Sequence, residues 1–186
     1  PFYPSTSDGG FSVSNHLAVD PEFGGWENIS GFDCDLMFDG VFNHTSSQHY
    51  WFKGWLSGDP KYKNFYHFFD QRPTEGSEEF KQLQKVVRPR ETDLLVDQKI
   101  NGKNVAVWAA FSEDQLDIDF SNPMVFLEIV KVLLTYVDQG ANYIRVDAVP
   151  FLWKELGTNC VHNEKTHLLV KAFRSVLDLK KPECLL

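Results

Sequence analysis

Two aspartates in the sequence each follow a short apolar run. Cys34–Phe38 precedes Asp39, and Asn142–Val146 precedes Asp147. Apolar runs of this length are typical of buried strands. In parallel α/β folds the ligand site lies at the carboxyl ends of the strands. We therefore expect both carboxylates at one active face.

Arg145 and Asp147 are two residues apart on the second of these strands. Alternate residues of a strand share a face, so both side chains point the same way. A neighbouring cation lowers the pKa of a carboxyl group and keeps it ionised, which a covalent nucleophile for sugar chemistry requires. A purely structural ion pair fits the same pattern, and the pattern alone does not decide between the two.

The second half of the chain alternates between helix and strand. Asn122 as N-cap, Pro123 at the first helical position and Gly140 after the last predict one helix, and a second is predicted over roughly Glu164–Leu179. The run before Asp147 lies between them, and 184–186 resembles the beginning of another strand. This alternation indicates a parallel sheet.

The middle of the chain, 45–110, breaks the alternation. It is rich in Trp, Tyr and Phe, contains Arg88-Pro89-Arg90, and carries Asn101-Gly102 between extended stretches, which is a hairpin signal. We predict an inserted subdomain of loops, short helices and a hairpin. The chain then divides into 1–44, 45–110 and 111–186.

The composition narrows the class of protein. The chain of 186 residues has 18 Lys and Arg against 26 Asp and Glu, a net charge of −8. That balance argues against nucleic acid or an anionic membrane as the main partner. No apolar run approaches the roughly 20 residues of a membrane span, and no signal segment opens the chain. Three widely spaced cysteines, an odd number, predict reduced thiols and a cytoplasmic protein.

Three segments resemble motifs of the α-amylase superfamily of glycoside hydrolases and transglycosylases. They are Asp39–His44 (DGVFNH), Gln115–Asp119 (QLDID) and Gly140–Ala148 (GANYIRVDA). Further stretches are similar to the sucrose phosphorylase group, which includes phosphorylases of glucosylglycerate. They are Pro1–Val13, Arg88–Arg90, Trp108–Gln115 and Leu152–Gly157.

This resemblance implies a partial (β/α)8 TIM barrel, from about the end of strand 2 to the start of strand 5, with the small subdomain inserted after strand 3. It implies glucosyl transfer from sucrose or a related α-glucoside to phosphate, by a retaining double displacement. A hydrolase or transglucosylase of the same superfamily is the alternative, and an inert fragment is another. Inorganic phosphate would be a co-substrate, with no organic cofactor, and the oligomeric state is left open.

The resemblance also assigns roles to residues. Asp147 would be the nucleophile and Arg145 would orient it. The other positions would bind substrate: Asp8 and His44 through glucose hydroxyls, Phe11 against the sugar ring, Gln115 by a polar contact, Arg90 at phosphate or acceptor, and Phe111 on the acceptor side.

Each of these residues also has a simpler interpretation. Asp8 suits a turn, His44 a satisfied loop position, and Arg90 a solvated surface. Asn43 lies where calcium-dependent amylases place a metal ligand. The phosphorylase group is not expected to need that ion, so packing is the alternative for Asn43.

Some features depart from the family pattern. A retaining mechanism needs a second carboxyl group as acid and base. We expect that glutamate, and a third assisting aspartate, beyond Leu186, because Glu183 precedes the last strand and lies at its wrong end. The chain would then be part of a longer enzyme and inactive alone. Gly24–Asp35 leaves little room for a helix, and Phe151 stands where phosphorylases of this group tend to have Tyr.

Overall fold

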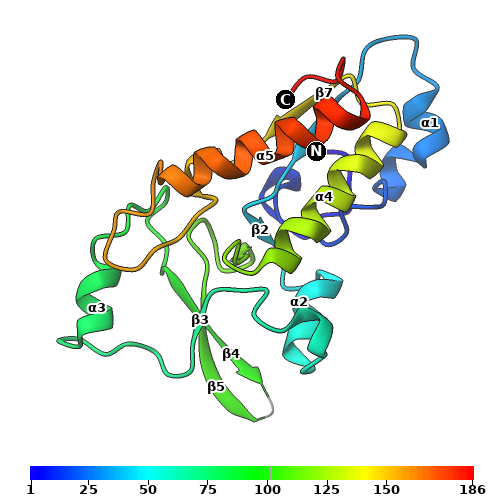
Figure 1. Ribbon diagram of the computed structural model, residues 1–186. Helices are drawn as coiled ribbons and strands as arrows, with labels where there is room; N and C mark the ends of the chain where they lie inside the picture. Colours follow the sequence, from blue (N-terminus) through cyan, green and yellow to red (C-terminus); the bar gives the residue numbers. More distant parts are fainter. Residues whose placement is uncertain (101) are drawn as a thin grey trace.

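Two parallel strands and two long helices form the part of the chain predicted to belong to a barrel. The structure, a computed structural model, describes residues 1–100 and 102–186. Strand β1 (Met37–Gly40) pairs with β7 (Tyr143–Val146), and the helices α4 (Pro123–Asp138) and α5 (Glu164–Lys180) pack beside them (Figure 1). Phe38 of β1 lies edge-on to Tyr136 of α4, with ring centroids 5.7 Å apart. The helices therefore share one hydrophobic core with the strands.

The register of the parallel pair decides which side chains meet. Met37 lies opposite Tyr143, and Asp39 lies opposite Arg145. Leu185 continues the parallel arrangement on the other edge of β7, where its carbonyl accepts from the Ile144 amide at 2.8 Å. The prediction of a parallel sheet is confirmed, because β1 and the residue Leu185 both pair in parallel with β7.

The first strand begins later than predicted. It runs from Met37 rather than Cys34, and it includes Asp39 instead of ending before it. Cys34 is exposed, and so is 63% of Met37. The pairing of β1 with β7 begins at Met37 and Tyr143, and the charged Asp35 interrupts the apolar residues before it, so the strand does not extend back to Cys34.

Both long helices begin at the residues that the sequence indicates. The Asn122 side chain accepts from the Met124 amide at 3.0 Å, and Asn163 caps α5 in the same way through Lys165. Such caps satisfy amides that have no partner within the helix. Gly140 follows α4 with φ of +95°, a conformation that favours glycine. The short stretch 24–35 holds only α1 (Trp26–Ser30).

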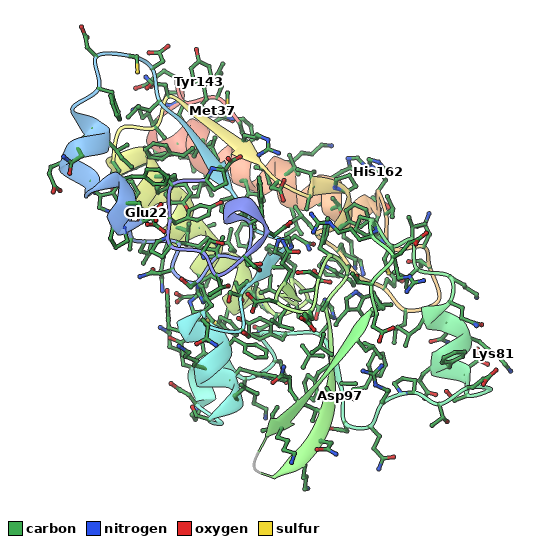
Figure 2. All side chains as sticks on the ribbon, turned by 180° about the vertical axis from the view of Figure 1, so that it is seen from behind. Glu22, Met37, Lys81, Asp97, Tyr143 and His162 are labelled. Atoms are coloured by element: carbon green, nitrogen blue, oxygen red, sulfur yellow. The ribbon has the colours of Figure 1, made fainter. Side chains whose placement is uncertain are left out.

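The region 45–110 contains short elements around a small antiparallel sheet. Its strands are β3 (Phe68–Phe69), β4 (Leu95–Ile100) and β5 (Lys103–Trp108), in the order β3-β5-β4. The helices are α2 (Tyr50–Leu56) and α3 (Glu78–Leu83). Ile100 pairs with Lys103, as the hairpin prediction requires, while Asn101 of the predicted turn lies outside the described residues. Figure 2 shows Asp97 of β4 and Lys81 of α3 far from the Met37–Tyr143 pair.

This region is tied to the rest of the chain at two places. Strand β2 (His44–Thr45) pairs with β6 (Leu116–Asp117), which joins its beginning to the segment that follows it. A second, smaller core combines Trp108 and Leu95 with Cys160, which follows β7 in the sequence. The boundaries 1–44, 45–110 and 111–186 stay a prediction.

Single-turn helices complete the described elements. They are 3-10 turns at Asp8–Gly10, Pro21–Phe23, Pro60–Tyr62 and Val149–Phe151. The three cysteines are free. Among the described residues, no helix combines the length and the apolar character needed to cross a bilayer.

Three histidines are buried within the fold. His16, His44 and His49 are at most 1% exposed. Burial lowers the pKa of His16 to about 4, of His44 to about 3 and of His49 to about 2. His16 and His49 contact each other through ring nitrogens 3.1 Å apart, and His16 also contacts the Val41 carbonyl. All three imidazoles are therefore neutral in the folded chain at neutral pH.

These histidines predict acid-sensitive folding. Their folded pKa values lie below the unfolded value of about 6.5, so the unfolded chain binds more protons, and stability present above that pH is lost as the pH falls. We expect the free energy of unfolding to drop between pH 6.5 and 4.5 by up to about 1.4 kcal/mol per pH unit for each histidine. Urea unfolding at several pH values measures this slope.

His167 offers a matched control, because it is exposed on α5. The substitution His167→Gln should leave the slope unchanged, whereas His16→Gln should reduce it. Equal stability at pH 7.5 and pH 5 would contradict the prediction.

Candidate active site

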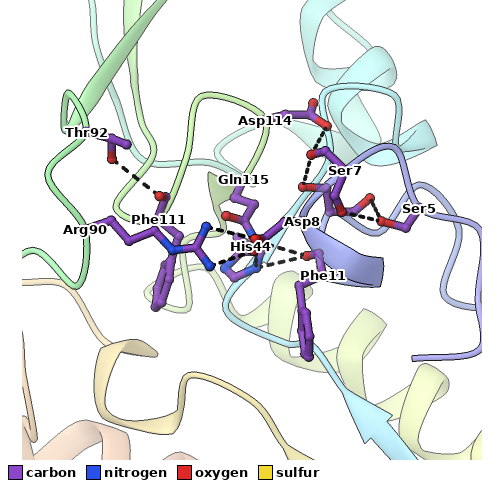
Figure 3. Close-up of polar contacts among 11 residues, drawn as sticks. Ser5, Ser7, Asp8, Phe11, His44, Arg90, Thr92, Phe111, Asp114 and Gln115 are labelled. Atoms are coloured by element: carbon purple, nitrogen blue, oxygen red, sulfur yellow. Dashed lines mark hydrogen bonds and ion pairs between the residues drawn. The ribbon is translucent and has the colours of Figure 1, made fainter.

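Asp8 and Arg90 form a bidentate ion pair, although they lie 82 residues apart in the sequence. Arg90 donates from Nη1 to Asp8 Oδ1 at 2.9 Å and from Nη2 to Oδ2 at 3.0 Å (Figure 3). These hydrogen bonds hold the pKa of Asp8 below its ordinary value. The Arg90 side chain is 46% exposed, so the pair lies at the rim of the site.

Gln115 connects this pair to His44. Its amide nitrogen donates to Asp8 Oδ2 at 2.9 Å and lies 3.1 Å from His44 Nε2. His44 Nε2 is also 3.1 Å from the Phe11 carbonyl oxygen. Figure 3 shows the Asp8 carboxylate in contact with both the Arg90 guanidinium and the Gln115 amide, beside the His44 ring. The structure thus brings together five of the residues that the sequence singled out.

Asp114 holds the loop that carries Asp8 and Phe11. Its carboxylate accepts from the Thr6 hydroxyl, from the Ser47 amide at 2.9 Å and from the Ser47 hydroxyl at 2.6 Å. The loop is a tight turn in which Asp8 itself has φ of +57°. The turn interpretation of Asp8 is therefore correct as geometry, and the same turn points its carboxylate at Gln115.

Arg145 lies between two carboxylates from neighbouring strands. It donates from Nη1 to Asp39 and from Nη2 to Asp147 Oδ1, the latter at 3.2 Å. The shared face that the sequence predicts for Arg145 and Asp147 is confirmed by this contact. The stronger partner of Arg145 is Asp39, because the register places it directly opposite.

The pKa of Asp147 is shifted upward, whereas from the sequence a neighbouring arginine is expected to lower it. Burial raises the pKa of Asp147 above its ordinary value, Arg145 opposes that rise, and Asp39 adds to it. Arg145 acts in the expected direction, but it is shared with Asp39 and does not outweigh the loss of hydration.

Aromatic rings connect the two halves of the site. The Arg145 guanidinium lies over the Phe11 ring, 5.7 Å from its centroid. The centroid of the Phe111 ring lies 5.1 Å from that of His44 and 5.3 Å from that of Phe151, which follows Asp147 in the sequence. A cavity of about 380 Å³ beside this region is lined by Asp8, but by neither His44 nor Asp147. All eight predicted residues lie in this region, and their roles stay predictions.

Sequence reasoning missed a buried polar group behind His44. Lys154 donates to Asn43 Oδ1 at 2.6 Å and lies 3.3 Å from Asp117 Oδ1. The side chains of Lys154 and Asp117 are 3% and 0% exposed. One lysine in the otherwise apolar stretch 151–154 is the only sequence signal for it, and the partners are far away in the sequence. Asn43 Oδ1 thus accepts a hydrogen bond from the Lys154 ammonium group.

Comparisons with known proteins agree on a family. The model of the α-amylase catalytic domain matches residues 1–185. The glucosylglycerate phosphorylase of Allomeiothermus silvanus is 46% identical, over 100% of this chain and 32% of the relative. The glucosylglycerate phosphorylase of Escherichia coli is 42% identical, over 98% of this chain and 32% of the relative. The chain thus spans about a third of the length of these curated relatives.

A solved structure agrees with the fold. The crystal structure of sucrose 6F-phosphate phosphorylase from Thermoanaerobacter thermosaccharolyticum superposes with a TM-score of 0.84 at 24% identity, and covers 95% of this chain and 38% of that one. The (β/α)8 architecture of that family explains the parallel strands, the two long helices and the position of Asp147 at a strand end. The chain belongs to the α-amylase catalytic-domain family, and it forms part of the barrel of that domain.

Proposed function

We propose that the chain is part of a retaining glucoside phosphorylase, which transfers a glucosyl group from an α-glucoside to phosphate. The observation that carries this proposal is the convergence of Arg145 and Asp147 with His44, Asp8 and Gln115 on one face. The names of the relatives favour glucosylglycerate as the donor. Sucrose is the second candidate.

The polar groups near Asp8 suit a sugar with several hydroxyl groups. Gln115 Oε1 is buried and has no hydrogen-bond partner among the described residues. A buried acceptor without a donor is costly, and a sugar hydroxyl would supply that donor. Asp8 and His44 would accept from and donate to neighbouring hydroxyls, and the Phe11 ring would contact the apolar face of the sugar.

Asp147 would act as the nucleophile of a double displacement. Its carboxylate would attack the anomeric carbon as the bond to the leaving oxygen breaks, and phosphate would then displace Asp147 to give α-glucose 1-phosphate. The leaving oxygen needs a proton from a second carboxyl group about 5–5.5 Å from the first. Glu183 lies near the amino end of β7, where Leu185 pairs with Tyr143, and Asp147 follows the other end. We infer that the acid belongs to a part of the enzyme outside these residues, and that the chain alone is inactive.

Arg90 is the candidate for phosphate binding. Arginine presents paired donors that match a phosphate group, and its present partner is the Asp8 carboxylate. Exposed ion pairs contribute only about 0–1 kcal/mol. Phosphate would therefore compete for Arg90 at low cost, which would release Asp8 toward the sugar. Phe111, in contact with His44, would line the acceptor side.

The phosphorylase proposal predicts phosphate-dependent turnover. We expect activity when these residues replace the aligned segment of the Allomeiothermus silvanus relative, because the chimaera would contain both the nucleophile and the rest of a barrel. With glucosylglycerate and phosphate, it should release glucose 1-phosphate, measured by a coupled phosphoglucomutase assay. Sucrose is the parallel donor.

The unmodified relative is the positive control, and the 186-residue chain alone should show no turnover. Glucose released at the same rate with and without phosphate would instead assign a hydrolase or transglucosylase. A folded chimaera without glucose 1-phosphate formation from either donor would contradict the proposal.

The substitution Asp147→Asn separates the nucleophile from a structural ion pair. In the chimaera it should lower kcat by at least about 10⁴-fold, the scale seen when a nucleophile is removed. In the chain, the folded pKa of Asp147 is raised, so ionisation above that pKa costs folding free energy. The free energy of unfolding at pH 7 should therefore stay equal or increase.

Asp138 is exposed at the end of α4 and gives the matched control. The substitution Asp138→Asn should change neither kcat nor the free energy of unfolding. A purely structural pair predicts the reverse result for Asp147→Asn: a less stable chain and near-normal phosphorolysis.

A further inference from the structure

A buried cluster of three polar side chains lies directly behind His44. Lys154, from the segment after Asp147, donates to Asn43 Oδ1 at 2.6 Å. Asp117 accepts from Asn43 Nδ2 at 2.5 Å and from the Ala110 amide at 2.9 Å. Nothing in the proposed reaction uses Lys154, yet burying a lysine beside an aspartate is expensive unless the geometry is good.

The cluster fixes which way the Asn43 amide faces. An ammonium group only donates, so it requires the oxygen of Asn43 on its side. An ionised carboxylate only accepts, so Asp117 requires the nitrogen on the other side. Turning the amide over would place donor against donor at Lys154 and acceptor against acceptor at Asp117. Asn43 therefore has one orientation in this environment.

The orientation of Asn43 in turn decides the tautomer of His44. Asn43 Nδ2 lies 3.1 Å from His44 Nδ1, which must accept. Burial lowers the pKa of His44 to about 3, so the ring is neutral and carries one proton. That proton then resides on Nε2, where the Phe11 carbonyl accepts it at 3.1 Å. The two hydrogens of Gln115 Nε2 face Asp8 and, at 3.4 Å, the same carbonyl, so its 3.1 Å approach to His44 Nε2 is a contact between two donors and not a hydrogen bond.

We propose that Lys154 is a positioning residue that, through Asn43, holds His44 as the Nε2–H tautomer and so keeps the one donor of the ring on the side that faces Phe11 and Gln115. The tautomer follows from the contacts with Asn43 and Phe11 and from the neutral ring, whereas its consequence for turnover rests on the proposed function. Lys154 belongs to the segment that follows Asp147, so the same stretch of chain carries the proposed nucleophile and the lysine that orients His44 through Asn43.

A structural role for Lys154 predicts something different. If the ion pair with Asp117 only joined the two segments, its loss would lower stability and leave the His44 ring unchanged. Without the ammonium group, Asn43 Oδ1 loses its donor, and a buried Asp117 without a counter-charge favours its protonated form, which can donate. Both constraints on Asn43 are then removed.

The test is the position of the proton on the His44 ring. Long-range 1H–15N correlation spectra of the chain with 15N-labelled histidine distinguish the two tautomers, and the signals missing from His44→Asn assign the ring. Wild type and Lys154→Arg, which keeps a donor-only group, should show Nε2–H. Lys154→Met should show a measurable Nδ1–H population, and Lys171→Met, on the exposed face of α5, should match wild type.

Two double variants keep the test valid if Lys154→Met does not fold. Lys154→Met/Asp117→Asn removes both buried charges, and it should also show Nδ1–H. Asn43→Asp/Asp117→Asn moves the carboxylate beside His44 Nδ1 without changing the buried net charge, so it should convert the ring to Nδ1–H. Rings that stay purely Nε2–H in the folded Lys154→Met variants and in Asn43→Asp/Asp117→Asn would overturn the proposal.

Kinetics in the chimaera give the functional readout. Lys154→Met should lower kcat/KM for the glucoside by about 10–100-fold, the scale seen when hydrogen-bond partners that orient metal-ligating histidines are removed. Lys154→Arg should restore most of it. An inactive wild-type chimaera with the predicted tautomer change would contradict the proposed function and leave Lys154 as the determinant of the tautomer. A loss of activity without any change in tautomer would assign Lys154 a structural role instead.

Discussion

The sharing of Arg145 between Asp39 and Asp147 is the constraint on which the site depends. It follows from the register of two parallel strands, because Asp39 lies opposite Arg145 and Asp147 is two residues further along the same face. Asp39 takes the stronger contact, which leaves Asp147 oriented but incompletely neutralised. A carboxylate held in this way keeps its direction, and under the proposed function it would give up less hydrogen-bond energy on bonding to the anomeric carbon.

Two ion pairs at different depths support the site in different ways. Asp8–Arg90 is at the rim, partly exposed, and contributes little to stability. Lys154–Asp117 is buried, so breaking it leaves an uncompensated charge in a dry environment. The rim pair is therefore suited to exchange partners with a ligand, and the buried pair is suited to hold Asn43 and His44 in one arrangement. The sequence contains both kinds of charge, and only burial distinguishes them.

Local signals predicted the elements well, and they failed where distant residues decide. Asn122, Pro123 and Gly140 act within one or two turns, so the first long helix could be placed from sequence. The start of β1 depended on its partner strand, and the prediction was three residues too early. The motifs and the resemblance identified the residues around Asp8 and Asp147. Lys154 escaped notice because it meets Asn43 across 111 residues, a contact that no local pattern encodes.

The region 45–110 is more than an attachment to the barrel segment. It supplies Arg90 to the rim, and the β2–β6 pair beside it places His44 opposite Asp117. Its small core takes in Cys160, from the same segment that carries Lys154. A displacement of this region would therefore move the rim arginine and strain the buried lysine together. The rim arginine and the hydrogen bonding of His44 therefore depend on one packed unit.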